Sequence, residues 1–505
     1  MRKLSIFILF IVMAVSLCGF IACGDKPESS SESVENQSQS ESVHVHSIEK
    51  VDEKAPTCDE DGNIAYYYCE ECDFFFADAD GEERISKYSV IVEATHSLAH
   101  FEKVMPEGEN NGTKEHWFCD LCEKYFLDEN AENETDADSL IIVSALKIPD
   151  FIVEVESGKN PVVLQLTDTQ IIDNAQARPG RNQSDYYGTD KMDERCFNYL
   201  TETINATKPD FIIITGDLVY GEFDDNGTSL ISLINFMESF KIPWSPVFGN
   251  HDNESKKGVD WQCQQLEAAE YCYFEQKTLT GNGNYSIGIS QNGKLTRVFY
   301  MLDSNGCGNA SAQSLANGHT TTRTGFGNDQ IEWYTEEITM IKEVSPDTKI
   351  SFAYHIQQSV FQLAFNKYGL NSGDFKGPLT IDTHPDKKEG DFGHFGNGMK
   401  GPWDTSLTVW KGMVALGVDS VFVGHEHLNN ASVVVDGIRF QFGQKSSEYD
   451  RFNWRNADGT IGGGYSMPSD ATSLMGGTVI PLSEEDGSIL NPYIYYCGDV
   501  MGTNP

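Results

Sequence analysis

Short apolar runs that each end in a cluster of polar residues constrain the fold of this chain most. Five such runs lie between residues 162 and 427, and helix-like stretches separate them. This alternation is typical of an α/β sheet with crossover helices. The helices that the pattern predicts include residues 191–207, 228–240, 328–343 and 403–416. The polar residues that end the five runs are Asp168, Gln170, Asp217, Asn250, His251, His355, His425 and His427.

Polar residues at several strand ends are expected to meet in space. In an open α/β sheet the carboxyl ends of the strands converge on one crevice. Carboxylate, amide and imidazole donors gathered there suit transition metals. Glycines precede Asp217, Asn250 and His425, and they let the backbone turn so that these side chains point inward. One such strand end is an ordinary turn signal, but five in one chain predict a metal centre.

The same blocks resemble the motifs of the calcineurin-like metallophosphoesterase superfamily, in a variant similar to the purple acid phosphatases. The family pattern runs D-x-H, G-D, G-N-H-[D/E], H and G-H-x-H, and the chain matches every block except at Gln170, where the family usually has His. The resemblance spans residues 162–435. It implies two mixed β-sheets flanked by helices, with a dinuclear centre of divalent or trivalent ions (Fe, Mn, Zn or Co) at the strand ends.

The resemblance also implies a role for each residue. The ligands implied for the first metal are Asp168, Asp217, His427 and, nearby, Gln170. Those implied for the second metal are Asp217, Asn250, His355 and His425. His251 would lie beside the metals without binding them and would protonate the leaving oxygen as general acid, while a metal-activated hydroxide attacks the phosphoryl group.

Two departures from the family pattern leave alternatives open. At Gln170 an amide oxygen replaces the usual imidazole, so the first metal is expected to be held loosely or to be of a different kind. Tyr220 follows the Gly-Asp block where purple acid phosphatases carry a tyrosine that binds ferric iron. It is either a phenolate ligand to Fe³⁺ or a ring packed on the cleft wall. Without the carboxylate or amide that other family members carry at that place, Glu222 or Asp252 would steer His251.

A small module occurs twice between residues 44 and 149, before the catalytic domain predicted at residues 150–505. The stretches CEECDFFFAD and CDLCEKYFLD lie fifty positions apart and share the pattern C-x-x-C-x-x-aromatic-Phe-x-Asp. Paired cysteines with nearby histidines predict zinc-ribbon-like sites. The candidate zinc ligands are His46, Cys58, Cys69 and Cys72 in the first copy and His100, His116, Cys119 and Cys122 in the second.

Two alternatives to one zinc site per copy remain open. The two Cys-x-x-Cys units would share a single site, or the cysteines would form disulfides in an oxidising compartment. The repeats resemble those of other bacterial surface proteins, which implies a structural or adhesive spacer that engages a surface partner.

The first 43 residues resemble an export and anchoring segment. Residues 1–23 read as a bacterial lipoprotein signal: Arg2 and Lys3 precede an apolar stretch, and the lipidated residue would be Cys23. The alternative is an uncleaved membrane anchor. Residues 24–43 are rich in Ser, Glu and Gln and are expected to form a disordered tether. Both readings predict an extracytoplasmic protein attached to the membrane at the cell surface.

The charge of the chain limits its partners. The formal net charge of -41 argues against a nucleic-acid partner, because phosphate backbones require a basic surface. It permits a small anionic substrate, since a bound metal inverts the local potential. The sequence therefore predicts a surface-anchored dinuclear-metal phosphoesterase that hydrolyses small phosphomonoesters or phosphodiesters. The alternative is a catalytically weak surface protein that uses this fold and the repeats to bind a partner.

Overall fold

The computed structural model describes residues 45–173, 176, 192–305, 325–370, 375, 377–399 and 408–497. The chain divides into two compact units, Met1–Thr95 and His96–Pro505. The signal predicted at residues 1–23, with Cys23, and the tether predicted at residues 24–43 lie outside the described residues. Within the described ranges, no helix has the length and apolar character needed to cross a membrane.

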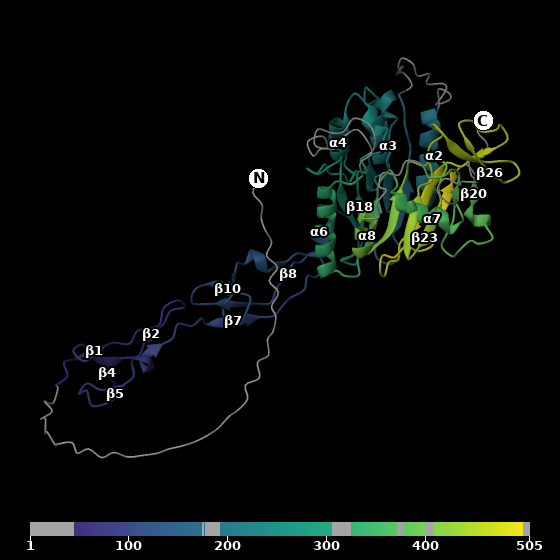
Figure 1. Cartoon of the computed structure of the whole chain (residues 1–505). Coiled ribbons are helices and arrows are strands. Elements are labelled where there is room, and N and C mark those ends of the chain that lie inside the picture. Colours follow the sequence, from purple (N-terminus) through teal and green to yellow (C-terminus); the bar gives the residue numbers. More distant parts are fainter. Residues whose placement is uncertain are drawn as a thin grey trace, which may run out of the picture. The chain divides into compact units, whose positions relative to one another are not determined.

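The second unit contains two large mixed sheets (Figure 1). The larger sheet has the order β13-β17-β18-β19-β22-β24-β23, and its strands β18, β19, β22 and β24 run parallel. In that order the strands are Phe151–Glu154, Tyr285–Gln291, Lys294–Met301, Lys349–Ala353, Val418–Val423, Ile438–Phe442 and Ser432–Val435.

The smaller sheet has the order β16-β15-β14-β28-β29, and β14, β15 and β16 run parallel. Its strands, in that order, are Trp244–Val247, Phe211–Thr215, Val162–Leu166, Gly476–Pro481 and Tyr493–Tyr496. The central strands β14 and β15 are apolar along nearly their whole length and buried on both faces, as expected of parallel strands covered on two sides.

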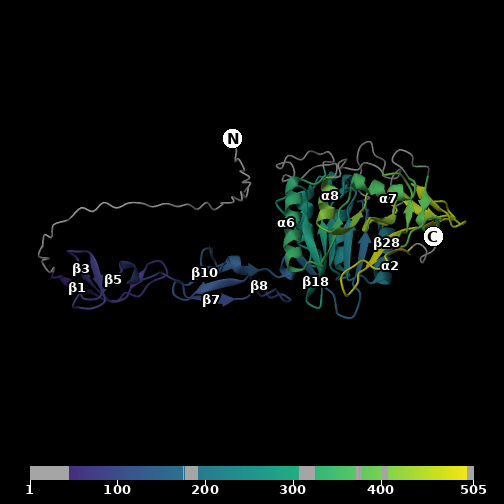
Figure 2. The same cartoon turned by 60° about the horizontal axis from the view of Figure 1, so that its bottom comes forward.

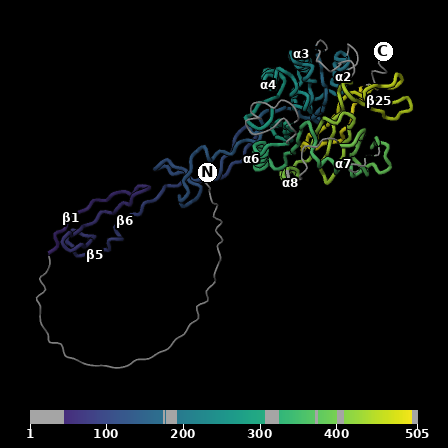
Figure 3. The backbone as a smooth tube through the Cα atoms, turned by 45° about the horizontal axis from the view of Figure 1, so that its top comes forward, coloured from purple at the N-terminus to yellow at the C-terminus, as the bar shows by residue number. Residues whose placement is uncertain are grey.

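Helices cover the outer faces of both sheets (Figures 2 and 3). One hydrophobic core joins the inner faces of the sheets and also includes α2, α3 and α4, and a second core joins the larger sheet to α6, α7 and α8. These helices are α2 Met192–Thr207, α3 Thr228–Glu238, α4 Val259–Glu267, α6 Asn328–Val344, α7 Gln362–Lys367 and α8 Thr408–Ala415. The four predicted helices and the two mixed sheets flanked by helices are thus confirmed.

The two repeats share one topology. In the first unit, β1, β3, β4 and β5 pair in the order β1-β3-β4-β5, and in the second unit β7, β9, β10 and β11 pair in the matching order. The strands of the first copy are Ile48–Val51, Tyr66–Cys69, Phe74–Phe76 and Arg84–Ile85. Those of the second copy are Leu98–Phe101, His116–Cys119, Lys124–Phe126 and Glu134–Thr135.

The segment that ends the second repeat is packed onto the domain formed by the two large sheets. The 3-10 turn Ala145–Lys147 that follows it places Leu146 in the core shared by the larger sheet and α6, with Ala145 and Ile148 packed against the same core. The compact second unit accordingly starts at His96 rather than at the end of the repeats.

Candidate metal centre

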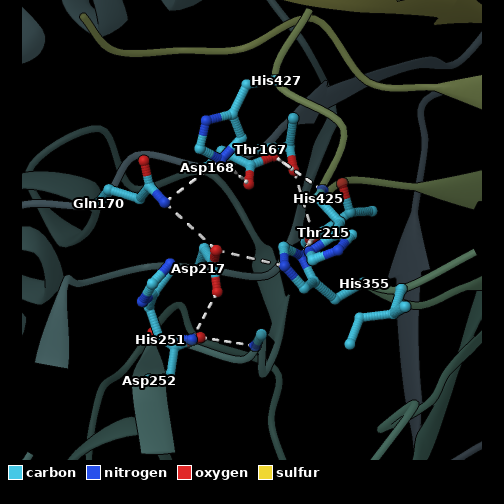
Figure 4. Close-up of polar contacts among 12 residues, drawn as sticks. Thr167, Asp168, Gln170, Thr215, Asp217, His251, Asp252, His355, His425 and His427 are labelled. Atoms are coloured by element: carbon cyan, nitrogen blue, oxygen red, sulfur yellow. Dashed lines mark hydrogen bonds and ion pairs between the residues drawn. The ribbon is translucent and has the colours of Figure 1, made fainter. Parts of the chain in front are cut away.

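The polar residues that end five strands meet at one edge of the two sheets (Figure 4). Asp168, Asp217 and Asn250 follow the neighbouring parallel strands β14, β15 and β16 of the smaller sheet. His355 follows β19, and the Gly-His-Glu-His segment follows β22, both in the larger sheet. The smaller sheet therefore supplies oxygen donors and the larger sheet supplies imidazoles.

Contacts at the centre join the two sheets. His355 Nε2 lies 3.3 Å from Asp217 Oδ2, and His427 Nε2 lies 3.2 Å from Asp168 Oδ1. The rings of His355 and His425 meet edge to face with their centroids 5.2 Å apart. Asp168, Asp217 and His427 offer ligand atoms that all lie within 4.8 Å of one another. The structure thus brings together most of the ligands predicted for both metals.

Two glycines make this close approach geometrically feasible. A Cβ at Gly216, whose φ is +88°, would lie 2.5 Å from His355 Nδ1, and a Cβ at Gly249 would lie 2.1 Å from Asp217 Oδ1. Any side chain at either position would push a proposed ligand out of the centre. The glycines that precede the ligands are therefore needed for space as well as for the turn.

The donors of the centre fit metal ions. Asn250 Oδ1 is buried and makes no hydrogen bond, although such buried polar atoms normally have partners. Asp168 Oδ1 and His355 Nε2 are also buried, and their contacts are the two imidazole–carboxylate pairs given above. Ligand atoms bonded to one ion at about 2.0–2.2 Å lie roughly 3 Å apart, similar to the two imidazole–carboxylate distances. The orientation of His355 also suits a ligand, because its Nδ1 donates to the Thr215 carbonyl oxygen at 2.8 Å and leaves Nε2 facing Asp217.

Electrostatics keep the carboxylates of the centre ionised. Burial acts to raise the pKa of Asp168, but the charge and hydrogen bond of His427 outweigh it and lower this pKa to about 2. Burial of Asp217 is likewise outweighed, by the charges of His355 and His251, so its pKa lies well below the usual range. Burial acts to lower the pKa of His355, but the charge of Asp217 outweighs burial and raises this pKa to about 9. A metal ion would therefore displace a proton from His355.

Gln170 reaches the centre, but its amide oxygen faces away from it. Lys445 Nζ donates to Gln170 Oε1 at 2.8 Å and to the Asp168 carbonyl oxygen at 3.0 Å. The Gln170 Nε2 group lies 3.3 Å from both Asp217 Oδ2 and His427 Nε2. Because an ammonium has only donors, Lys445 fixes this orientation. The prediction that Gln170 ligates the first metal is therefore wrong for this arrangement, since an amide N–H₂ group offers the metal no lone pair.

His251 lies beside the ligands, and its partner is a residue that the sequence analysis did not select. Its Nδ1 lies 2.9 Å from Glu254 Oε2, and its backbone N–H donates to Asp217 Oδ1 at 2.9 Å. Asp252 accepts instead from the backbone N–H groups of Val219 and Gly249 at 3.0 and 2.6 Å. The expectation that Glu222 or Asp252 steers His251 is thus corrected: Asp252 caps the loop, and Glu254 holds the imidazole.

Tyr220 packs its ring on the imidazole of His251. The ring centroids are 3.8 Å apart with an interplanar angle of 28°, and the tyrosine is buried in a cluster with Phe223 and Tyr449. This packing favours the cleft-wall interpretation over a phenolate ligand. Burial acts to lower the pKa of His251, but the charge of Asp217 and the hydrogen bond to Glu254 raise it to about 9.

Three residues at the centre were not predicted, and each had a signal in the sequence. Lys445 follows β24, a further parallel strand that ends at the same edge. Glu254 is three residues after His251 on a one-turn helix, a spacing that places two side chains on one face. Asp450 lies 3.2 Å from His427 Nδ1 and so orients that ligand, but only its position in a loop after Lys445 could have suggested it.

In the first repeat the structure brings the predicted histidine to the cysteine pair, but in the second repeat it brings a histidine that was not predicted. His46, Cys69 and Cys72 converge in the first unit, and His96, Cys119 and Cys122 converge in the second. Cys58 does not belong to the His46 group.

The two histidines predicted as ligands in the second copy have other partners. His100 lies 2.9 Å from Glu115 Oε1, and His116 stacks on Phe101 with ring centroids 4.9 Å apart. Their prediction as ligands is wrong, because the ring of His100 stacks on Trp117 with centroids 4.7 Å apart, His116 Nδ1 lies 2.9 Å from the Lys114 carbonyl oxygen, and neither imidazole joins the cysteine pair.

Comparison with known proteins identifies the family to which this chain belongs. The chain belongs to the calcineurin-like phosphoesterase family, which matches residues 161–429. The superfamily resemblance carried by the strand-end motifs is thus confirmed.

Individual relatives are similar over parts of their length. Phosphatase DCR2 of Saccharomyces cerevisiae is 25% identical over 252 residues, which make up 48% of this chain and 39% of that protein. "Probable inactive purple acid phosphatase 29" of Arabidopsis thaliana is 25% identical over 275 residues, 48% of this chain and 61% of that protein. The chain thus matches less than two thirds of either relative. A solved dimetal phosphatase from Danio rerio is similar with a TM-score of 0.34 and 9% identity, over 67% of this chain and 99% of that chain.

Proposed function

We propose that this protein is a metal-dependent phosphoesterase that hydrolyses small phosphomonoesters or phosphodiesters. The observation that carries the proposal is the pairing of a buried ligand cluster with a histidine that does not belong to it. Asp168, Asp217, His355 and His427 are buried, whereas His251 is partly exposed beside them and is held by Glu254. A protein that only bound a metal would need no such histidine.

The residues of the centre divide into two roles. Asp168 and His427 would hold one ion, His355, His425 and Asn250 a second, and Asp217 lies between the two groups. Bound ions would supply the positive charge that binds the phosphoryl oxygens and activates water. The protein keeps Asp168 and Asp217 ionised for this purpose.

His251 would act as the general acid. Its raised pKa keeps the imidazole protonated at neutral pH, ready to protonate the leaving oxygen. Glu254 and the ring of Tyr220 hold the imidazole in place, so Nε2 is the nitrogen available to the substrate. Glu254 is then a positioning residue for the proposed reaction.

A second candidate function follows from Lys445. Its buried ammonium, next to Asp168 and Gln170, places a positive charge and an amide N–H₂ group where the family usually offers another ligand. Both features would weaken the binding of the first metal ion. One relative of this chain is named as a probable inactive enzyme. This arrangement would favour the second function, in which a catalytically weak protein uses the fold to bind a partner.

One experiment separates these two functions. Residues 24–505 would be freed of metal and assayed with an aryl phosphomonoester and an aryl phosphodiester, with Mn²⁺, Zn²⁺, Co²⁺ or Fe²⁺ added singly. We expect turnover with at least one metal, and His251→Ala should lower kcat by about 10²–10⁴-fold while still binding metal. His384→Ala is the control, since this histidine packs against Tyr368 at the end of a 3-10 turn and is not among the residues gathered at the centre. A folded, metal-loaded protein without turnover on either ester would support the binding function instead.

We also propose that the enzyme works outside the cytoplasm, attached to the membrane through Cys23. The support is the sequence of residues 1–23 and the polar tether that follows. Cys23→Ala should move the protein from the detergent phase to the aqueous phase when cells are extracted with a phase-separating detergent. Retention of the variant in the detergent phase would indicate an uncleaved anchor.

A further inference from the structure

Each repeat gathers one imidazole and two thiolates at equivalent positions. In the first unit, His46 Nδ1 lies 3.3 Å from Cys72 Sγ, and Cys69 completes the group. The residues fifty positions later repeat this arrangement in the second unit: His96 Nδ1 lies 3.5 Å from Cys122 Sγ, and Cys119 completes the group. Imidazole and thiolate are the donors of structural zinc sites. These two groups are called the His–Cys–Cys trios below.

The histidine of each trio is held in the same orientation by a phenylalanine. His46 packs on Phe76 with ring centroids 4.8 Å apart and an angle of 53°. His96 packs on Phe126 at 4.7 Å and 56°. Both rings therefore present Nδ1 to the second cysteine of the pair. The packing restricts the rotation of each imidazole, and the agreement of two separate copies argues against a chance contact.

A strained turn brings the two cysteines of each trio together. Asp73 and Glu123, which directly follow the second cysteine, have φ values of 56° and 58°. This left-handed region is unfavourable for a residue with a side chain. Both copies keep the turn without a glycine, so something at the turn must stabilise it in the folded repeat.

Neither repeat has a hydrophobic core that would do so. The buried apolar side chains among its own strands and turns are Cys69, Phe76 and Val90 in the first copy and Cys119, Phe126 and Leu140 in the second. Modules of about 50 residues seldom stay folded on so small a core without a disulfide or a metal. The cysteines are part of that core, and the structure shows no disulfide between the cysteines that it describes.

We propose that each repeat binds one zinc ion through its His–Cys–Cys trio, and that this ion takes the place of a hydrophobic core in holding the strands of the repeat together. The sites are separate from the metal centre of the catalytic domain, so the inference does not depend on the proposed phosphoesterase activity. It assigns the ion a structural role.

Cobalt substitution tests the proposal in the chain of residues 24–505. Thiolate ligands give Co²⁺ an intense near-ultraviolet charge-transfer band, and none of the ligands proposed at the strand ends is a thiolate, so the band reports on the repeats. We expect the reduced, metal-free protein to develop this band, and Zn²⁺ to abolish it by displacement. Cys72→Ser and Cys122→Ser should each remove about half of the band, because each destroys one of two sites.

Matched histidine variants test the ligand assignment. His96→Ala should weaken Co²⁺ binding at the second site by at least about tenfold, whereas His100→Ala, four residues away in the same repeat, should leave the band and the affinity unchanged. Thermal unfolding of the catalytic domain, followed in parallel, shows that each variant is folded. A folded, reduced protein without the band would overturn the proposal, as would an undiminished band in Cys72→Ser.

Alkylation distinguishes zinc from a disulfide in the protein isolated from cells. If zinc is bound, Cys69 and Cys72 should resist iodoacetamide until a chelator is added. If they resist until a reductant is added, they form a disulfide and the proposal is wrong.

Discussion

His251 combines a partly exposed position with a charge environment that keeps it protonated. The charge of Asp217 acts on its ring, Glu254 hydrogen-bonds its Nδ1, and Tyr220 covers one of its faces. A raised histidine pKa means that the acid form is present below about pH 9 and is lost as the pH rises through that value. The alkaline limit of activity should therefore depend on the residues that touch this ring.

Glu254→Gln tests this dependence. Removing the carboxylate removes one of the interactions that raise the His251 pKa, so the acid form should be lost at lower pH. We expect the alkaline limb of the kcat–pH profile to move to lower pH, while kcat on the acidic side of that limb changes little. Glu222→Gln, at one of the two positions that the sequence suggested, should leave the limb in place. An unshifted limb in Glu254→Gln would show that this residue does not act on His251.

Lys445 is the residue that most distinguishes this centre from the family pattern. Lys445→Met removes the ammonium and lets the Gln170 amide turn its oxygen toward the ligands. We expect the affinity of the more weakly bound metal to rise about tenfold, which corresponds to about 1.4 kcal/mol. Competition with a fluorescent chelator would measure it. Lys411→Met, on the unrelated helix α8, is the control, and an unchanged or lower affinity in Lys445→Met would show that the ammonium does not restrain Gln170.

At the scale of elements, the sequence predicted the helices, the mixed sheets and most ligands for a physical reason. Parallel strands ending at one edge bring their next residues together whatever the loops do, so strand ends such as Asp217 and His355 could be recognised from their position alone. The orientation of Gln170 could not, because it depends on Lys445, which is 275 residues away in sequence. The choice of His96 over His100 likewise depends on contacts that spacing does not show: His96 packs on Phe126 beside the cysteine pair, whereas His100 stacks on Trp117.

An ion pair between a buried arginine and a partly exposed aspartate ties three strands of the larger sheet together. The guanidinium of Arg297 on β18 is fully buried and donates two hydrogen bonds of 2.7 Å to Asp419 on β22 and one to Ser420, and it also contacts Ser351 on β19. Removing the carboxylate would leave a buried charge without its partner.

Asp419→Asn should destabilise the domain for this reason. We expect a loss of about 3–5 kcal/mol, seen as a lower melting temperature of the catalytic domain by circular dichroism. Asp436→Asn, an exposed substitution of the same kind in the turn between β23 and β24, should change the melting temperature very little. Equal melting temperatures for the two variants would contradict the assignment of Arg297 to this ion pair.

At the scale of the whole molecule, the boundary of the catalytic unit differs from the one that the motifs suggest. The motifs begin near residue 162, but the compact unit includes the second repeat, because Leu146 is part of the core beside α6. Packing of this kind has no motif, so the sequence did not show it. The second repeat is therefore expected to contribute to the stability of the enzyme without taking part in its chemistry.

Two deletions test this division. Removal of residues 24–95 should leave both kcat and the melting temperature of the catalytic domain unchanged. Removal of residues 24–148 should also leave kcat intact but should lower the melting temperature, since the loss of a buried leucine costs about 2–5 kcal/mol. Loss of turnover from a folded protein lacking residues 24–95 would show that the domain is not an autonomous enzyme.

The central claim is that the residues at the strand ends form a metal centre that hydrolyses phosphoesters, and one titration tests it most directly. Metal-free residues 24–505 would be titrated with Mn²⁺ or Zn²⁺ while both metal binding and release of an aryl alcohol from its phosphoester are followed, with Asp217→Asn in parallel. The account predicts that turnover appears as metal binds, and that Asp217→Asn loses both together because this carboxylate lies between the two ligand groups. Metal bound by the wild-type protein without turnover, or turnover that survives in Asp217→Asn, would contradict it.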